Sequence, residues 1–335
     1  MSSDVSSAGL RETEPSPVVH SRFPAPAGVS DQARAYLDGM PPFAELDRPE
    51  LDDVDGWKLF VAAMDTQVQQ MIEPRLPPEG ELVRGEVDAA GVRTFTLRPA
   101  ALTDEGDEPI FLEIHGGGLT MGGGDLAWMM AATHARDRRG VTWVPDYRMP
   151  PDHPYPTPLD DVLAAYRAAL ALRPAGRIVV SGESGGANLA AALLLRARAE
   201  GLPMPAALVL LTPQVDLTES GDSFRTNLGM DIMGTLMKQN LLYADGTDLS
   251  DPHLSPLFGD LSGFPSTFVQ SGTRDMFLSN AVRMHRALRR AQVEAELHVF
   301  EAMPHGSFGG SAPEDLELRA EVRRFEARHL ARPSS

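Results

Sequence analysis

Residues 177–195, RIVVSGESGGANLAAALLL, run from a short β-branched segment through a glycine-rich turn into an alanine-rich segment. This order predicts a buried strand that is followed at once by a helix. The turn, residues 182–186 (GESGG), fits the pattern Gly-x-Ser-x-Gly, in which a serine sits on a tight strand-to-helix turn and glycines relieve crowding. Ser184 is therefore a candidate nucleophile, and the alternative is a turn that needs only small residues.

Strands and helices alternate on both sides of this turn. Strands are expected at 81–87, 92–97, 110–114, 141–147, 177–181, 207–211, 267–271 and 294–300, and helices at 126–136, 159–172, 187–198, 279–291 and 313–329. Parallel strands require crossover connections, which are usually helical, so the order predicts an α/β fold with a mainly parallel sheet and helices on both faces. Reactive side chains are then expected at the carboxyl ends of the strands.

Three parts of the chain are distinguished by composition. Residues 1–30 are rich in Ser, Pro and Glu and are expected to form a flexible N-terminal tail. Residues 31–75 repeat apolar side chains at helical spacing, interrupted by Pro41 and Pro42, and are interpreted as an N-terminal helical cap segment. Residues 76–335 form the predicted catalytic domain, with a cap insertion around 215–250 whose methionine-rich centre, 226–243, is expected to be helical.

The composition excludes several classes of protein. A formal charge of −17 disfavours nucleic acid as a partner, because binding it relies on clustered basic residues. No apolar run is long enough for a membrane span, and the first residues do not resemble a secretory signal, so a cytoplasmic location is expected. The absence of cysteine rules out a thiol nucleophile, and only Lys58 and Lys238 are lysines, neither in a Ser-x-x-Lys arrangement. A reactive serine therefore needs a histidine base.

Of the nine histidines, His305 is the best candidate for that base. It lies in a loop just past the last predicted strand, where its side chain can reach the carboxyl edge. His20 falls in the tail, and the predicted elements contain the histidines interpreted as surface or packing residues: His134, His285, His298 and His329.

The third member of a triad orients the histidine, and Asp275 follows the predicted strand 267–271 directly. Asp251 and Asp260 precede that strand and are interpreted as turn or cap residues, whereas Glu183, beside the serine, is expected to point elsewhere. The resulting chain order Ser184, Asp275, His305 is the order of α/β-hydrolases.

An oxyanion hole is predicted at residues 115–118 (HGGG), which follow strand 110–114. Glycines allow the backbone to turn and to present amides that side chains would obstruct. Gly117, Gly118 and Gly185 are the preferred donors, with Gly116 as the alternative; a flexible glycine turn is the competing interpretation.

Together these segments resemble the hormone-sensitive lipase family of α/β-hydrolases, in its bacterial carboxylesterase branch. The similarity covers about residues 80–330 and rests on HGGG at 115–118, DYRMPPDHPYP at 146–156, LDD at 159–161, GESGG at 182–186, GTRD at 272–275 and the His305-Gly pair. The resemblance implies an eight-stranded sheet and a cap built from the N-terminal helices and an insertion after the serine turn. Gly185 stands where the family more often has alanine, and Leu119 replaces a common aromatic residue.

The sequence thus predicts a serine hydrolase that cleaves carboxylic esters or lactones, of small to medium acyl size, through an acyl-enzyme. Neither a cofactor nor a metal is expected, and a homodimer is one assembly that the sequence allows. Two alternatives are an amide or peptide hydrolase with the same triad and a non-catalytic, ligand-binding member of the fold. Tyr147, Arg148, Asp160 and Asp161 are interpreted as structural residues that fix loop geometry.

Overall fold

The computed structural model describes residues 23–41, 46–102 and 106–330. Its centre is a single sheet in the order β1-β2-β4-β3-β5-β6-β7-β8. The strands are β1 (Leu82–Ala89), β2 (Val92–Pro99), β3 (Ile110–Ile114), β4 (Val141–Pro145), β5 (Ile178–Glu183), β6 (Ala207–Leu211), β7 (Thr267–Gly272) and β8 (Ala295–Phe300). Strand β2 runs antiparallel to β1 and β4, and the pairs from β4 through β8 are parallel. The predicted eight-stranded, mainly parallel α/β architecture is confirmed.

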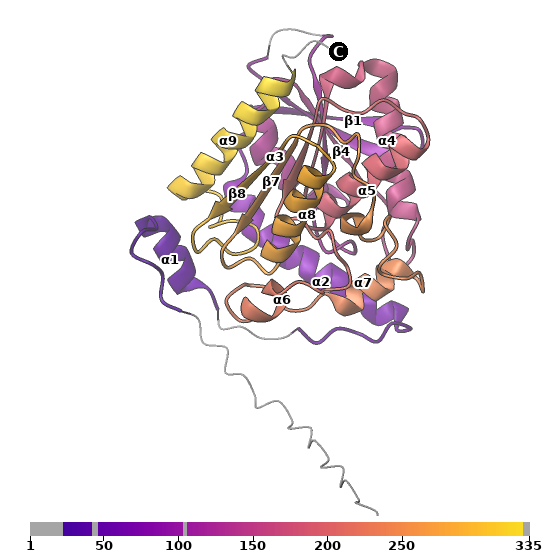
Figure 1. Ribbon diagram of the computed structural model, residues 1–335. Coiled ribbons are helices and arrows are strands. Elements are labelled where there is room, and N and C mark those ends of the chain that lie inside the picture. Colours follow the sequence, from indigo (N-terminus) through magenta and orange to yellow (C-terminus); the bar gives the residue numbers. More distant parts are fainter. Residues whose placement is uncertain (1–22, 42–45, 103–105, 331–335) are drawn as a thin grey trace, which may run out of the picture.

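Helices cover both faces of this sheet (Figure 1). One layer contains α4 (Thr157–Leu172), α5 (Gly185–Ala199) and α8 (Leu278–Arg290), and the other contains α3 (Asp125–Asp137) and α9 (Pro313–Leu330). Successive side chains of a strand point to opposite faces, so Val180 packs in the core under α4 and α5 whereas Val179 packs against α9. Burial on both faces explains why these strands are continuous apolar runs.

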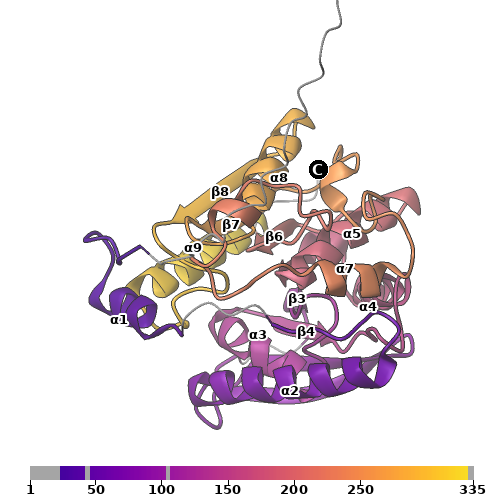
Figure 2. The ribbon, with the colours of Figure 1, turned by 90° about the horizontal axis from the view of Figure 1, so that it is seen from below.

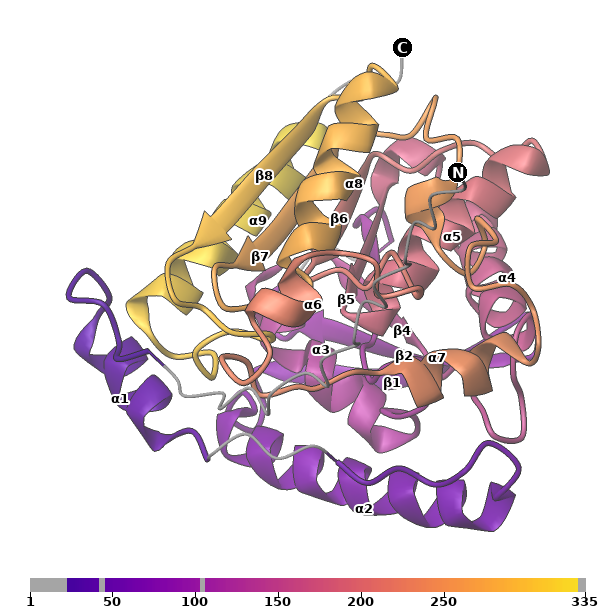
Figure 3. The same ribbon diagram turned by 60° about the horizontal axis from the view of Figure 1, so that its bottom comes forward.

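The N-terminal segment contains two helices that lie in different places. Helix α1 (Asp31–Gly39) packs beside α9, where the Ser30 amide and hydroxyl both donate to Glu314 at 2.7 Å. Helix α2 (Val54–Ile72) crosses below the carboxyl ends of the strands, near α6 (Ser223–Thr226) and α7 (Met237–Ala244) (Figures 1 and 3). Short 3-10 turns occupy Glu73–Arg75, Ala175–Arg177 and Pro256–Phe258. Of the two described helices of the predicted cap segment, α2 therefore lies across the strand ends and α1 does not.

Side-chain contacts hold this covering layer together. The segment before α2 reaches α7, because Lys238 Nζ donates to the Arg48 carbonyl and to Glu50, both at 2.9 Å. At the other side, the Gly122 amide donates to Asp65 Oδ1 of α2 at 2.9 Å. Seen from below in Figure 2, α2 and α7 lie across the strand ends.

The prediction of one helical run over 226–243 is wrong in its middle. Helix α6 ends at Thr226 and α7 begins at Met237. Between them Gly229 has a φ of +80°, and the buried Asp231 carboxylate binds backbone amides of two other loops. These long-range bonds favour an irregular backbone over a helix.

Some predicted features fall outside the described residues: the first 22 residues of the tail, His20 within them, and Pro42. None of the helices in the described part of the chain has the length and apolar character that crossing a membrane requires.

Candidate active site

Ser184 occupies a strained turn between β5 and α5. Its φ of 56° and ψ of −120° are unusual for a residue with a side chain, and its amide donates to the Leu211 carbonyl at 2.9 Å. A Cβ on Gly182 would overlap the Gly186 carbonyl, and a Cβ on Gly186 would overlap the Ile114 carbonyl. The two glycines are thus required by close backbone approach, and they bring the serine up to the end of β3.

The glycine loop, residues 115–119, packs directly against this turn. A Cβ on Gly116 would lie 3.0 Å from the Glu183 carbonyl and 3.4 Å from Ser184 Cβ. A Cβ on Gly185 would lie 2.8 Å from the Leu119 amide nitrogen and 3.3 Å from that of Gly118. The φ values of Gly117 and Gly118 are +117° and +58°, which glycine adopts without strain. Gly116 and Gly118 of the loop therefore lie against the turn that carries Ser184 and Gly185.

Tyr147 fixes the first residue of this loop. Its hydroxyl donates to the His115 carbonyl at 2.8 Å, and its ring stacks on the imidazole with centroids 4.1 Å apart. Burial, opposed by the contact with the Gly116 carbonyl, lowers the pKa of His115 to about 4. His115 is therefore neutral at pH 7 and unsuited to act as a base.

Asp275 and His305 form a buried pair at the ends of β7 and β8. Their side chains meet at 3.2 Å between Asp275 Oδ1 and His305 Nδ1. The fully buried carboxylate also accepts from Ser271 Oγ at 2.6 Å and from the Phe277 amide at 2.8 Å. With Nδ1 donating to Asp275, Nε2 is left as the free basic nitrogen of the ring.

The loops that carry this pair are joined by hydrogen bonds from backbone amides. The Arg274 amide donates to the Met303 carbonyl at 3.2 Å, and the Ala302 amide donates to Thr273 Oγ1 at 2.7 Å. A Cβ on Gly272 would overlap that Met303 carbonyl, so the first glycine of the GTRD motif is needed for the loops to meet.

The charges around His305 are mostly negative. Burial opposes the charged imidazolium, but the hydrogen bond and charge of Asp275, with the charges of Asp231 and Glu183, raise the pKa of His305 overall. The Phe277 ring stands edge-on to the imidazole at 5.0 Å. Glu183, which was expected to point elsewhere, thus lies near the imidazole, and that expectation was wrong. We call Glu183, Asp231, Asp275 and His305 the His305 cluster.

Ser184 and His305 are both buried, and within the described part of the chain no hydrogen bond joins their side chains. They are 6% and 8% exposed, and a Cβ on Gly306, the residue after His305, would lie 3.7 Å from Glu183 Oε1. The loop that carries His305 therefore lies beside the turn that carries Ser184.

Other sequence candidates have structural partners. Asp251 and Asp260 each accept an amide two residues ahead, at 2.8 and 2.9 Å. Arg148 makes a bidentate pair with Asp161, at 2.7 and 2.9 Å. Among the histidines, His134 contacts Glu113, His298 contacts Glu296 and Glu321, and the His329 ring packs on Phe325.

Sequence reasoning missed Asp231, which lies beside the Asp275 and His305 pair. The available signal was an acid within an apolar run, GMDIM, because a charged side chain among apolar residues is expected to have buried partners.

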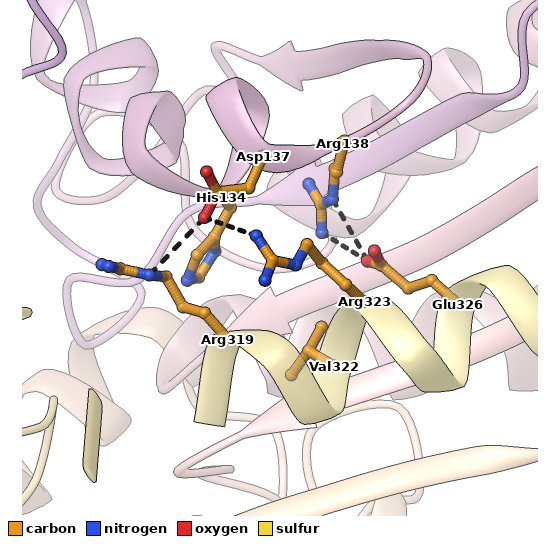
Figure 4. A pocket seen from close by; sticks show the side chains of 7 residues that line it. All are labelled: His134, Asp137, Arg138, Arg319, Val322, Arg323 and Glu326. Carbon is orange, nitrogen blue, oxygen red and sulfur yellow. Dashed lines mark hydrogen bonds and ion pairs between the residues drawn. The ribbon is translucent and has the colours of Figure 1, made fainter. Parts of the chain in front are cut away.

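A second group of buried charges lies away from the strand ends, between α3 and α9. This Arg138 cluster consists of Glu113, His134, Arg138, Ser181 and Glu326, and Figure 4 shows Arg138 paired with Glu326. The adjoining cavity has a volume of about 10 Å³, which is room for roughly one water molecule. Within the described residues no group of three or more His, Asp or Glu side chains could hold a metal ion.

Comparison with known proteins gives a consistent result. Residues 111–309 match a family model described as the α/β hydrolase fold. An esterase of Acinetobacter venetianus is 31% identical over 263 residues, which cover 75% of this chain and 84% of that protein. The carboxylesterase NlhH of Mycobacterium tuberculosis is 31% identical over 287 residues, covering 77% and 89%.

Solved structures agree over almost the whole chain. The crystal structure of esterase E25 superimposes with a TM-score of 0.86 at 33% identity, covering 92% of this chain and 97% of that one. An esterase from the bacterial hormone-sensitive lipase family superimposes with a TM-score of 0.74 at 31% identity, covering 85% and 100%.

Proposed function

This chain belongs to the α/β-hydrolase fold family, among the bacterial hormone-sensitive lipase relatives, and we propose that Ser184, His305 and Asp275 carry its chemistry. Its activity is that of a carboxylic-ester hydrolase. Each of these residues has its own role in the reaction, and the side chains around them select the esters that bind.

In the proposed mechanism Ser184 Oγ attacks the ester carbonyl carbon while His305 Nε2 accepts the serine proton. Asp275 holds the ring in the tautomer that leaves Nε2 basic, and its charge stabilises the imidazolium. The imidazolium then protonates the alcohol as the C–O bond breaks. Water, deprotonated by the same nitrogen, then attacks the acyl-serine, and the imidazolium returns this proton to Ser184 Oγ as the acyl–oxygen bond breaks and the acid leaves.

Negative charge develops on the carbonyl oxygen in both steps. We assign the stabilisation of this oxyanion to the amides of Gly117, Gly118 and Gly185, with the Gly116 amide as the alternative. Donors that already point at the oxygen stabilise its charge without having to reorient during the reaction. The packing of the glycine loop against Ser184 supports this assignment.

An apolar cluster beside His305 supports a preference for apolar acyl groups. Phe224, Leu236, Met276 and Phe277 are its buried members, with Leu228 and Met233 packed against them. Leu236 also lies at the glycine loop, since its Cδ1 is 3.7 Å from where a Cβ on Gly118 would be. We propose small to medium acyl esters as substrates, and lactones as a second class.

One observation carries the proposal most directly: Ser184 holds a positive φ while the glycine loop lies against it. A turn that merely required small residues would have no reason to keep a strained serine there.

The test is hydrolysis of p-nitrophenyl esters of increasing chain length, a lactone and a p-nitroanilide. We expect ester turnover by the wild type and loss of about 10³-fold or more in Ser184→Ala. Ser250→Ala, which changes an exposed turn serine, is the matched control. Equal turnover in Ser184→Ala would overturn the proposal, and faster anilide than ester cleavage would favour the amide hydrolase.

The cap role of residues 31–75 and of the 215–250 insertion, a cytoplasmic location and a homodimer also remain proposals. Cell fractionation and light scattering test the last two.

A further inference from the structure

The irregular segment between α6 and α7 is hydrogen-bonded to the loop that carries Asp275. Asn227 Nδ2 donates to two carbonyls of that loop, Thr273 at 3.1 Å and Asp275 at 2.8 Å. The Asn227 carbonyl in turn accepts the amides of Met230 and Asp231, at 2.9 and 3.2 Å, which closes a turn. This turn sets the position of Asp231.

The Asp231 carboxylate is fully buried and accepts three backbone amides. Oδ1 accepts from Ile232 at 2.6 Å and from His305 at 3.2 Å, and Oδ2 accepts from Met276 at 2.7 Å. One carboxylate therefore binds both the residue after Asp275 and the backbone of His305. Because each loop contributes a donor, this side chain adds a bridge between the two loops next to Asp275 and His305, beyond the bonds that join the loops directly.

The same carboxylate adds charge where the base works. Burial, followed by repulsion from Asp275 and opposed by His305 and by the backbone donors, raises the pKa of Asp231 to about 6. His305 faces Asp231 from the insertion, Asp275 from the loop after β7 and Glu183 from the end of β5. Glu183 in turn faces His134 and Glu113. The imidazole thus has three carboxyl groups around it.

We propose that Asp231 is a positioning residue for the Asp275 and His305 pair, fixing the spacing of their loops and stabilising the imidazolium with a second negative charge. The inference rests on the proposed function. It means that the insertion after β6 supports the catalytic pair as well as covering the site.

The test compares Asp231→Asn with the wild type in ester hydrolysis across pH. Asparagine keeps the size but loses the charge and one acceptor, so we expect kcat to fall about 10- to 100-fold, with a smaller change in KM. On the acidic side of its pH profile, kcat/KM falls as His305 becomes protonated, and we call this part of the profile the acid limb. The apparent pKa of the acid limb should fall by about half a pH unit, because the imidazolium loses a negative neighbour. A merely structural residue would lower stability without moving this limb.

Asp315→Asn is the matched control. Asp315 is also buried and accepts backbone amides, among them those of Phe308 at 2.9 Å and Ala312 at 3.0 Å, but it has no hydrogen bond to Asp275 or His305. Its acid limb should stay at the wild-type position. An equal shift in both variants, or no change of kcat in Asp231→Asn, would overturn the proposal.

If circular dichroism shows that Asp231→Asn does not fold, Asp231→Glu is the second variant. It keeps the charge but displaces the carboxylate by one methylene, so kcat should fall while the acid limb stays; a wild-type kcat contradicts the inference. An NMR titration of His305 in the Ser184→Ala background, with and without Asp231→Asn, measures the shift without turnover. Because this titration needs no turnover, an absent shift would contradict the role of Asp231 without bearing on the proposed esterase function.

Discussion

The His305 cluster and the Arg138 cluster both bury carboxylates with a histidine, yet they differ in the nature of their cation. In the Arg138 cluster a guanidinium pairs with Glu113 at 2.5 Å and with Glu326 at 2.8 Å. The charge of Arg138 and the bonds from His134 and Ser181 outweigh burial and hold the pKa of Glu113 well below its usual range. In the His305 cluster the cation is an imidazolium, which exists only while it carries a proton.

The two clusters differ in whether their main cation can lose its proton. Arginine cannot be deprotonated in a protein, so Arg138 carries a fixed positive charge that pairs with Glu113 and Glu326 between α3 and α9. A histidine surrounded by carboxylates gains and loses a proton near neutral pH, which is what a general base requires. Burial of charge alone therefore does not mark a functional group, and the position of His305 at the strand ends, beside the Ser184 turn, is what distinguishes it from the half-buried His134.

The largest expected effect is that of Asp275→Asn, which removes the orienting charge of the His305 cluster. We expect kcat to fall by about 10³- to 10⁴-fold, because the imidazole loses the partner that sets its tautomer. Steady-state kinetics with a p-nitrophenyl ester measures it. Asp251→Asn, a change in a turn aspartate, serves as control and should retain wild-type kcat; an unchanged rate in Asp275→Asn would move the acid to another residue.

Arg138→Met should have the next largest effect, on folding. Removing the guanidinium leaves Glu113 and Glu326 buried without their cation, so we expect a loss of about 3–5 kcal/mol in the free energy of unfolding. Urea titration measures it, while kcat of the folded variant should stay near the wild-type value. The exposed pair of Arg93 and Glu86 provides the control, since Arg93→Met should change stability little. A large loss of kcat with intact stability would mean that the two clusters are coupled.

Gly185→Ala should have a smaller effect, at the glycine loop. The new Cβ would lie 2.8 Å from the Leu119 amide nitrogen, so the loop must shift and the donors lose alignment. We expect kcat to fall about 10- to 100-fold. Gly39→Ala, whose Cβ meets nothing within 4 Å, is the control. Wild-type kcat in Gly185→Ala would show that the alanine common in relatives is accommodated here too.

The smallest effect concerns pH. Because the pKa of His305 is raised above its ordinary 6.5, kcat/KM should fall about tenfold per pH unit on the acid side of a value above 6.5. The same shift stabilises the fold fully below pH 6.5, and this contribution is lost as pH rises through the raised pKa. Glu183→Gln should move the acid limb down by about a few tenths of a pH unit. An apparent pKa well below 6.5 for the acid limb of the wild type would contradict the raised pKa that the carboxyl groups around His305 produce.

Much of this molecule could be predicted locally. The strands, the turn at Ser184 and the loop at His305 follow from short patterns, because apolar runs, glycines and chain order act over a few residues. Asp231 was missed since its partners Met276 and His305 lie 45 and 74 residues away in sequence. The helix expected over 226–243 was wrong in its middle for the same reason: the tertiary bonds of Asp231 and Asn227 outweigh local helix propensity.

By itself, the sequence determined which chemical groups are present and at which edge they gather, because the alternation of strands and helices brings the ends of β3, β5, β7 and β8 together. Only the tertiary structure decided the surroundings of each group. Asp231 lies at the Asp275 and His305 pair because the insertion folds back on two loops, and Glu113 keeps its charge because Arg138, at the end of α3, pairs with it. Proton affinity depends on distance and burial, and these are properties of the folded chain.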